Sequence, residues 1–118
     1  MAEDNRFDRL SINIRAKTKW NKKDKDSRLK ASHKYHFLFS SRNWKENDWS
    51  GDFDSLNDKQ KNLIIKGELI RTYDSLPNID KTKIKSKLQL NKFSSKWYRL
   101  TSKDKKKLLN YILSVSDG

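Results

Sequence analysis

The chain of 118 residues contains no cysteine, one proline and three glycines. Without cysteine there is no disulfide framework, no thiolate nucleophile and no cysteine-ligated zinc or iron–sulfur site. No apolar run approaches the roughly 20 residues that a membrane-spanning helix needs. The N-terminus also lacks the basic-then-apolar order of a secretory signal. We therefore expect an intracellular protein, in the cytoplasm or the nucleus, that has no membrane partner.

Motifs of catalysis and of metal binding are also lacking. There is no glycine-rich phosphate loop, no nucleophile–base pair and no carboxylate pair outside an acidic stretch at 43–58. His33 and His36 form an H-x-x-H pair that would share one helix face, but zinc needs further ligands and only Asp24 or Asp26 stands nearby. We expect no enzyme, no catalytic residue, no metal and no cofactor.

Positive charge is what the chain has in excess. Its 28 Lys and Arg residues against 15 Asp and Glu give a formal net charge of +13. A small chain with this charge repels itself unless salt or a polyanion compensates. By charge alone the partner would be acidic, with nucleic acid first and an anionic membrane surface or an acidic protein second; of these we expect nucleic acid or an acidic protein. Much lysine and asparagine is also typical of an AT-rich genome, which would raise the charge without any selection for binding.

The distribution of charge separates these two explanations. Residues 81–107 contain eleven basic residues and one acid, Asp104, and Arg15–Lys34 contains nine basic residues and two acids. Between them, Asn43–Asp58 contains five acids and one lysine. Codon bias alone would spread lysine evenly, so two basic blocks around an acidic one predict a polarised surface that binds nucleic acid.

The predicted fold is mainly α, a single domain over 1–118 built as a compact bundle of short helices. In the second half, Asn57 and Gln60 have the spacing of a capping box, and Pro77 ends the helix that follows them. Asp80 is expected to cap a short helix at about 81–88. A turn and a second helix at about 91–99 follow, and Thr101 with Asp104 begins a final helix.

The first half has two interpretations. Residues 9–16 alternate apolar and polar side chains, which is typical of a half-buried strand. A helix at about 27–40, capped by Asp26 or Ser27, would follow, although a hairpin between these two segments is the alternative. Residues 1–26 could also form a basic, partly flexible arm.

Three bulky aromatic residues, Trp44, Trp49 and Phe53, lie in the acidic stretch among turn-forming residues. We expect an irregular loop there, pinned to the core by these rings, because acidic surroundings would repel the phosphates of a stacked nucleotide. If the rings are exposed instead, they would suit a protein interface.

Two short stretches resemble DNA-binding families. The order KLQLNKFSSKWYRL resembles the turn and recognition helix of helix-turn-helix and homeodomain proteins, where an apolar-x-apolar turn precedes a helix with a tryptophan beside another aromatic residue. The stretch KFSSKWYRLTSKDKKKLL resembles the junction between the second and third helices of a high-mobility-group box. Each covers less than a fifth of the chain, which is too little to assign a family.

The sequence thus predicts a small basic protein that binds DNA or RNA mainly through phosphates, with Arg15–Lys34 as a second contact. The alternative is a non-enzymatic interaction module, such as a viral or phage-encoded regulator that docks on an acidic partner protein. Trp97 is expected in the core, whereas Tyr98 fits either the core or a stacked base. The predicted binding residues are Lys81, Lys83, Lys85, Lys87, Lys92, Lys96, Arg99, Lys103, Lys106 and Lys107.

Overall fold

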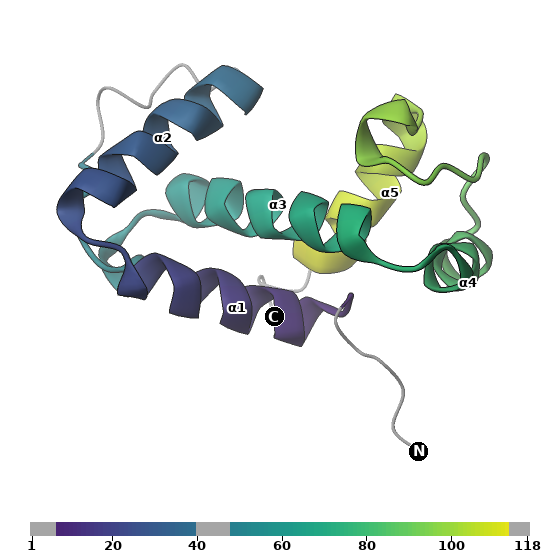
Figure 1. Ribbon diagram of the computed structural model, residues 1–118, viewed down its shortest axis with the longest axis horizontal. Helices are drawn as coiled ribbons and strands as arrows, with labels where there is room; N and C mark the ends of the chain where they lie inside the picture. Colours follow the sequence, from purple (N-terminus) through teal and green to yellow (C-terminus); the bar gives the residue numbers. More distant parts are fainter. Residues whose placement is uncertain (1–6, 40–47, 114–118) are drawn as a thin grey trace. The chain divides into compact units, whose positions relative to one another are not determined.

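The computed structural model describes residues 7–39 and 48–113, without the side chains of 36–39. These residues form five α-helices and two short 3-10 helices and contain no strand, so the mainly α prediction is confirmed (Figure 1). Internal contacts group them into a C-terminal unit, residues 7–12 and 68–113, and an N-terminal unit, residues 13–67 without the gap. The elements are α1 (Arg9–Lys22), α2 (Lys25–Phe39), η2 (Phe53–Ser55), α3 (Asp58–Ser75), α4 (Asn78–Leu88), η3 (Trp97–Arg99) and α5 (Ser102–Leu113).

The strand expected at 9–16 is wrong, because α1 occupies this segment. Ile12, Ala16 and Trp20 are buried at intervals of four residues, whereas Leu10 and Ile14 are exposed. The apparent alternation is therefore two helical stripes, of which one is buried. Of the segment expected as a basic arm, residues 9–22 form α1 with this stripe buried, and residues 1–6 lie outside the described residues.

The first two helices are capped by aspartates that were not among the predicted caps. The Asp8 carboxylate accepts hydrogen bonds from the backbone N–H of Ser11 (3.0 Å) and from its hydroxyl (2.9 Å). Asp24 accepts from the backbone N–H of Ser27 (2.8 Å), so Asp24 caps α2 instead of Asp26 or Ser27. This bond and one from the Ser27 hydroxyl lower the pKa of Asp24. The helix expected at 27–40 is confirmed as α2, and the alternative hairpin is wrong.

Trp49 and Phe53 lie in the core of the N-terminal unit. Both are buried, and the Trp49 ring meets Trp20 edge to face with 6.0 Å between the ring centroids. Trp20 also donates its indole N–H to the carbonyl of Gly51 (3.0 Å), which fixes this loop to α1. The expectation that the rings pin the loop is confirmed for these two residues, and Trp44 lies outside the described residues.

Helix α3 begins and ends as its sequence predicts. The backbone N–H of Asn57 donates to Gln60 Oε1 (2.9 Å), and the backbone N–H of Gln60 donates to Asn57 Oδ1 (2.8 Å). This reciprocal pair is a capping box. The helix ends at Ser75, two residues before Pro77. Its buried stripe is Ile65, Leu69 and Tyr73.

The C-terminal unit has one helix fewer than expected. Helix α4 starts at Asn78, with Pro77 at the N-cap position instead of Asp80. After Gln89, which closes α4 in a left-handed conformation (φ 55°), the chain is irregular as far as the 3-10 turn at 97–99. The predicted helix at 91–99 is wrong, and with it the recognition helix that the helix-turn-helix resemblance implies. We call residues 89–101 the α4–α5 loop.

Candidate nucleic-acid interface

Asp104, the single acid in 81–107, is hidden inside the C-terminal unit. Its side chain has no exposed surface. Its two carboxylate oxygens accept hydrogen bonds from the backbone N–H groups of Asn91 (2.9 Å) and Lys92 (3.1 Å). Over 81–107, all of which the structure describes, the exposed surface therefore carries basic side chains and no carboxylate. Just outside this segment, Asp74 and Asp80 are half-buried.

Thr101 begins α5, although its capping differs from the expected reciprocal pair. The Thr101 hydroxyl accepts from the backbone N–H of Asp104 (3.1 Å), as predicted. The Asp104 carboxylate does not complete the pair, because it turns to the α4–α5 loop. The sequence therefore located the start of α5 but not the residue that organises the loop.

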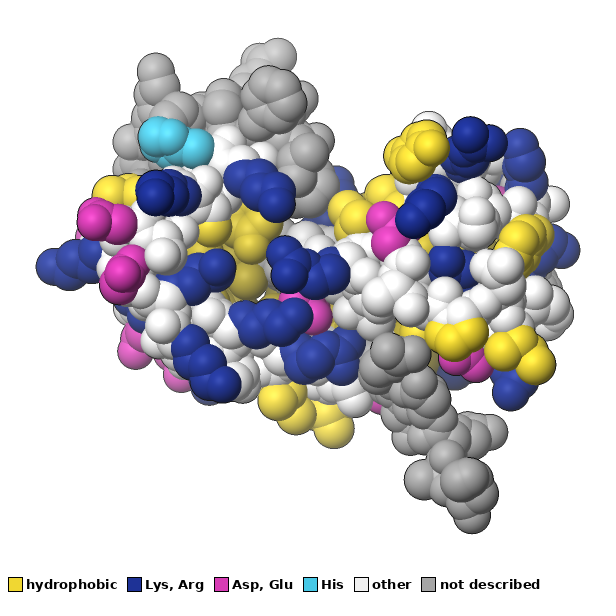
Figure 2. Space-filling model, viewed as in Figure 1, with side chains coloured by type: hydrophobic (Ala, Val, Ile, Leu, Met, Phe, Trp, Pro, Cys, Tyr) yellow, Lys and Arg dark blue, Asp and Glu magenta, His cyan; other side chains and the backbone are white. Residues whose placement is uncertain are grey.

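Most of the predicted binding residues are accessible. Figure 2 shows Lys and Arg side chains across the part of the molecule formed by α4 and the α4–α5 loop, at the right of the view. Lys85 and Lys107 are half-buried and Lys81 is buried. The exposed predicted residues are Lys83, Lys87, Lys92, Lys96, Arg99, Lys103 and Lys106.

Lys81 has a structural position instead of the expected binding position. Only 3% of it is exposed, and its ammonium group donates to the backbone carbonyls of Ser95 and Asp74. Burial lowers the pKa of Lys81, and the nearby Asp74 carboxylate partly offsets this effect. The helical spacing could have identified it, since Lys81 shares the inward face of α4 with Ile84 and Leu88. We omit Lys81 from the candidate interface.

Helix geometry pairs lysines on α4 and on α5. Lys83 and Lys87 are four residues apart and share one face of α4. On α5, Lys103 and Lys107 share a face in the same way, while the inward face carries Asp104. Each helix therefore presents one pair of lysines a single turn apart on a common face.

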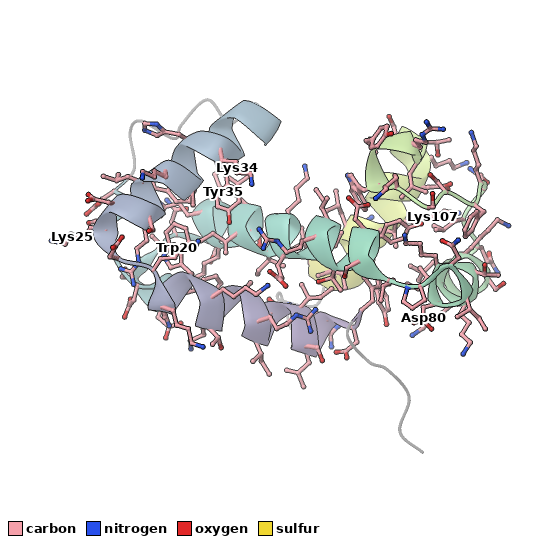
Figure 3. All side chains as sticks on the ribbon, in the orientation of Figure 1. Trp20, Lys25, Lys34, Tyr35, Asp80 and Lys107 are labelled. Atoms are coloured by element: carbon pink, nitrogen blue, oxygen red, sulfur yellow. The ribbon has the colours of Figure 1, made fainter. Side chains whose placement is uncertain are left out.

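Contacts between α4 and α5 bring two of these lysines to the C-terminal end of α4. Lys87 donates to the hydroxyl of Tyr111 (2.9 Å), with its ammonium nitrogen 4.9 Å from the ring centroid. Lys107 extends from α5 toward α4 and donates to the carbonyl of Gln89 (2.7 Å) (Figure 3). This position is favourable for a cation, because the C-terminus of a helix carries partial negative charge.

The α4–α5 loop has a defined conformation although it is not helical. The Tyr73 hydroxyl donates to the carbonyl of Ser94 (2.7 Å), and the backbone N–H of Trp97 donates to Asp74 Oδ1 (2.8 Å). Trp97 itself is buried, as expected, and Tyr98 is exposed. Because Asp104 also holds the start of the loop, the lysines of the loop project from an ordered backbone.

The second basic block, Arg15–Lys34, lies among acids. Lys17 forms an ion pair with Asp54 (3.0 Å), a residue of the acidic stretch that packs in the same unit. The Arg28 guanidinium donates to the carbonyls of Ser50 (2.6 Å) and Trp20 (3.3 Å), so it links α2 to the end of α1 and to the loop before η2. This block is therefore less suited to a polyanion than 81–107.

A metal site and a membrane span are not found in the described part of the chain. His33 is exposed and no cluster of three metal-ligating side chains occurs there, while the His36 side chain lies outside the description. Among the described helices, none is long and apolar enough to cross a membrane. Comparisons with protein-family models, curated proteins and solved structures gave no match.

Proposed function

We propose that the protein binds nucleic acid mainly through its phosphates, with residues 83–107 of the C-terminal unit as the contact surface. The observation that carries this proposal is the burial of Asp104. Because the single acid of the segment is enclosed by backbone N–H groups, a polyanion would meet basic side chains from α4, the α4–α5 loop and α5 without a repelling carboxylate. Such contacts release counterions from the polyanion, which drives binding.

Phosphate contact fits this surface better than the reading of base sequence in a duplex groove. Groove reading commonly uses a helix that presents several side chains to base edges. The segment that would supply this helix, 91–99, is an irregular loop ending in a 3-10 turn. We therefore expect affinity to depend on charge and salt far more than on duplex sequence.

The alternative, an interaction module that docks on an acidic protein, loses the support of two of the three aromatic rings that would favour it, and the third, Trp44, lies outside the described residues. Trp49 and Phe53 are buried in the N-terminal unit and are not available to a partner. An acidic protein would still be attracted by the lysines of 83–107, so the experiment below uses nucleic acid and an acidic polypeptide side by side.

Charge reversal with a matched control tests the proposal. One variant carries Lys96→Glu and Lys103→Glu, both in exposed positions of the proposed surface. The control carries Lys59→Glu and Lys61→Glu at the start of α3 in the N-terminal unit. Both variants lower the formal net charge of +13 by the same amount. Affinity for fluorescent oligonucleotides and for polyglutamate is measured by anisotropy at about 50 mM salt.

The proposal predicts that the surface variant loses at least about tenfold in affinity for the oligonucleotides, since each lost phosphate contact removes a released counterion and each new carboxylate repels. The control should lose less than about threefold, because only its long-range field changes. Equal losses would show that net charge alone attracts the oligonucleotide and would contradict a surface at 83–107. Binding to polyglutamate but not to oligonucleotides would favour the acidic-protein alternative.

A further inference from the structure

Two aromatic rings are exposed in the most basic segment of the chain. Among the aromatic side chains whose burial is described, Tyr98 (67% exposed) and Phe93 (39% exposed) stand out, and both belong to the α4–α5 loop. The other described rings are buried or half-buried. Figure 2 shows hydrophobic side chains standing between Lys and Arg side chains on this part of the molecule. From the same loop, Trp97 and Leu100 are buried in the core, whereas Tyr98 and Phe93 are not needed there.

Tyr98 stands on a fixed support. It belongs to the 3-10 turn at 97–99, where it follows the buried Trp97 and precedes Arg99 and the buried Leu100. The turn is held by the hydrogen bond from the backbone N–H of Trp97 to Asp74 Oδ1 and by the bond from the backbone N–H of Leu100 to the carbonyl of Trp97 (3.0 Å). A ring presented in this way loses little conformational entropy when a ligand stacks on it.

The residue beside the ring supplies the charge that a nucleotide needs. Arg99 Nε donates to the Tyr98 hydroxyl (3.4 Å), and the guanidinium carbon lies 5.7 Å from the ring centroid. Lys96 is exposed two residues before Tyr98, and Lys92 is exposed next to Phe93. A flat aromatic surface among cations matches a nucleotide, whose base stacks on the ring while its phosphate meets the cation.

We infer that the α4–α5 loop is a platform for unpaired bases, so that the ligand class is single-stranded nucleic acid and Tyr98 is a stacking residue. A paired base in a duplex has both faces covered by its neighbours, and it cannot stack on a protein ring without leaving the helix. The phosphate contacts of 83–107 then track the same strand. This inference rests on the proposed function, and it adds which form of nucleic acid is preferred.

The test compares Tyr98→Ala with Tyr98→Phe in the full chain. Tyr98→Phe keeps the ring and removes only the hydroxyl. The ligands are a single-stranded 15-residue oligothymidine, the matching oligouridine, a 15-base-pair duplex, and a strand of the same length in which the sugars carry no bases. Thermal unfolding of each variant checks that the fold is intact, which we expect because the Tyr98 side chain is exposed.

The wild-type protein should bind one or both base-carrying single strands more tightly than the duplex at equal salt. Tyr98→Ala should weaken single-strand binding by roughly 5- to 150-fold, the range expected for the loss of one base–aromatic stack. It should leave binding to the duplex and to the abasic strand within about twofold of wild type, because those ligands offer phosphates without an unpaired base. Tyr98→Phe should stay within about twofold on every ligand. The two base-carrying strands decide between DNA and RNA as the preferred source.

Two results would overturn the inference while leaving the proposed function in place. In the first, Tyr98→Ala binds the single strands as tightly as wild type, while the variant with Lys96→Glu and Lys103→Glu loses affinity for them. In the second, Tyr98→Ala loses as much affinity for the abasic strand as for the base-carrying strands. The effect would then come from charge or local structure and not from stacking. If wild-type protein binds none of the ligands at about 50 mM salt, the proposed function itself fails.

Discussion

Replacing Asp104 by asparagine should destabilise the protein far more than removing the charge of an exposed aspartate. The carboxylate is fully buried and receives two backbone N–H groups, from Asn91 at 2.9 Å and Lys92 at 3.1 Å. Asparagine has nearly the same shape, but one of its two terminal groups is a donor. One of the two N–H groups would therefore face another donor in a buried site.

The magnitude follows from the energy of a hydrogen bond to a charged group. Each such bond contributes roughly 1.5–3 kcal/mol, and the remaining bond to a neutral amide would be weaker than before. We expect the free energy of unfolding to fall by about 2–3 kcal/mol. For a chain of this length, that corresponds to a decrease in Tm of about 10 °C. Urea unfolding followed by circular dichroism at 222 nm measures the change directly.

The matched control is Asp54→Asn, which also removes one aspartate charge. Asp54 is exposed and pairs with Lys17 across 3.0 Å, so solvent screens the interaction. Its loss should change the free energy of unfolding by less than about 0.5 kcal/mol. If the Asp104 variant is no less stable than this control, the carboxylate does not hold the α4–α5 loop. The explanation for the acid-free surface would then be refuted.

Three further predictions concern local structure. Gln89 has a φ of 55°, so Gln89→Gly should raise the free energy of unfolding by about 0.5–1 kcal/mol in urea titration, while Gln89→Ala should give no gain. Asn57→Ala removes one half of the α3 capping box and should lower the stability by about 1 kcal/mol, with a matching loss of helical signal on heating. Burial, reinforced by Asp74 and Asp104, raises the pKa of Tyr73 to about 12. Since an unfolded tyrosine ionises near 10, wild-type stability should decline from about pH 10 upward, and Tyr73→Phe should decline less steeply between pH 10 and 12. A parallel pH profile for the two proteins would contradict the burial of the Tyr73 hydroxyl as the cause.

Local sequence signals predicted the structure where short-range hydrogen bonds decide it. The capping box of Asn57 and Gln60 and the stop near Pro77 set the bounds of α3, because both act through backbone groups within four residues. The start of α5 at Thr101 follows the same logic. The alternation at 9–16 led to the wrong prediction of a strand. Ile12 and Ala16 are buried while Leu10 and Ile14 are exposed, and this difference depends on what packs against α1.

The loop at the centre of the candidate site depends on contacts that sequence spacing does not show. The carboxylate of Asp104 reaches back 12 and 13 residues to Lys92 and Asn91, and this contact replaces the helix predicted at 91–99. The spacing of Lys81 from Ile84 and Leu88 indicates the inward face of α4, but not that its ammonium group donates to the Ser95 and Asp74 carbonyls. The basic character of 81–107 could be predicted, whereas the removal of its single acid from the surface could not.

Salt dependence of binding tests the central claim most directly. Seven predicted binding residues of 83–107 are exposed, and each phosphate contact on a single strand contributes roughly −0.7 to the slope of log affinity against log salt. If most of them engage, the slope should lie between about −3 and −5, and affinity should fall roughly 60- to 1,000-fold between 50 and 200 mM salt. In the Lys96→Glu and Lys103→Glu variant the slope should be shallower by about 1 or more. A wild-type slope between 0 and about −1 would contradict the claim that this surface binds a nucleic-acid backbone.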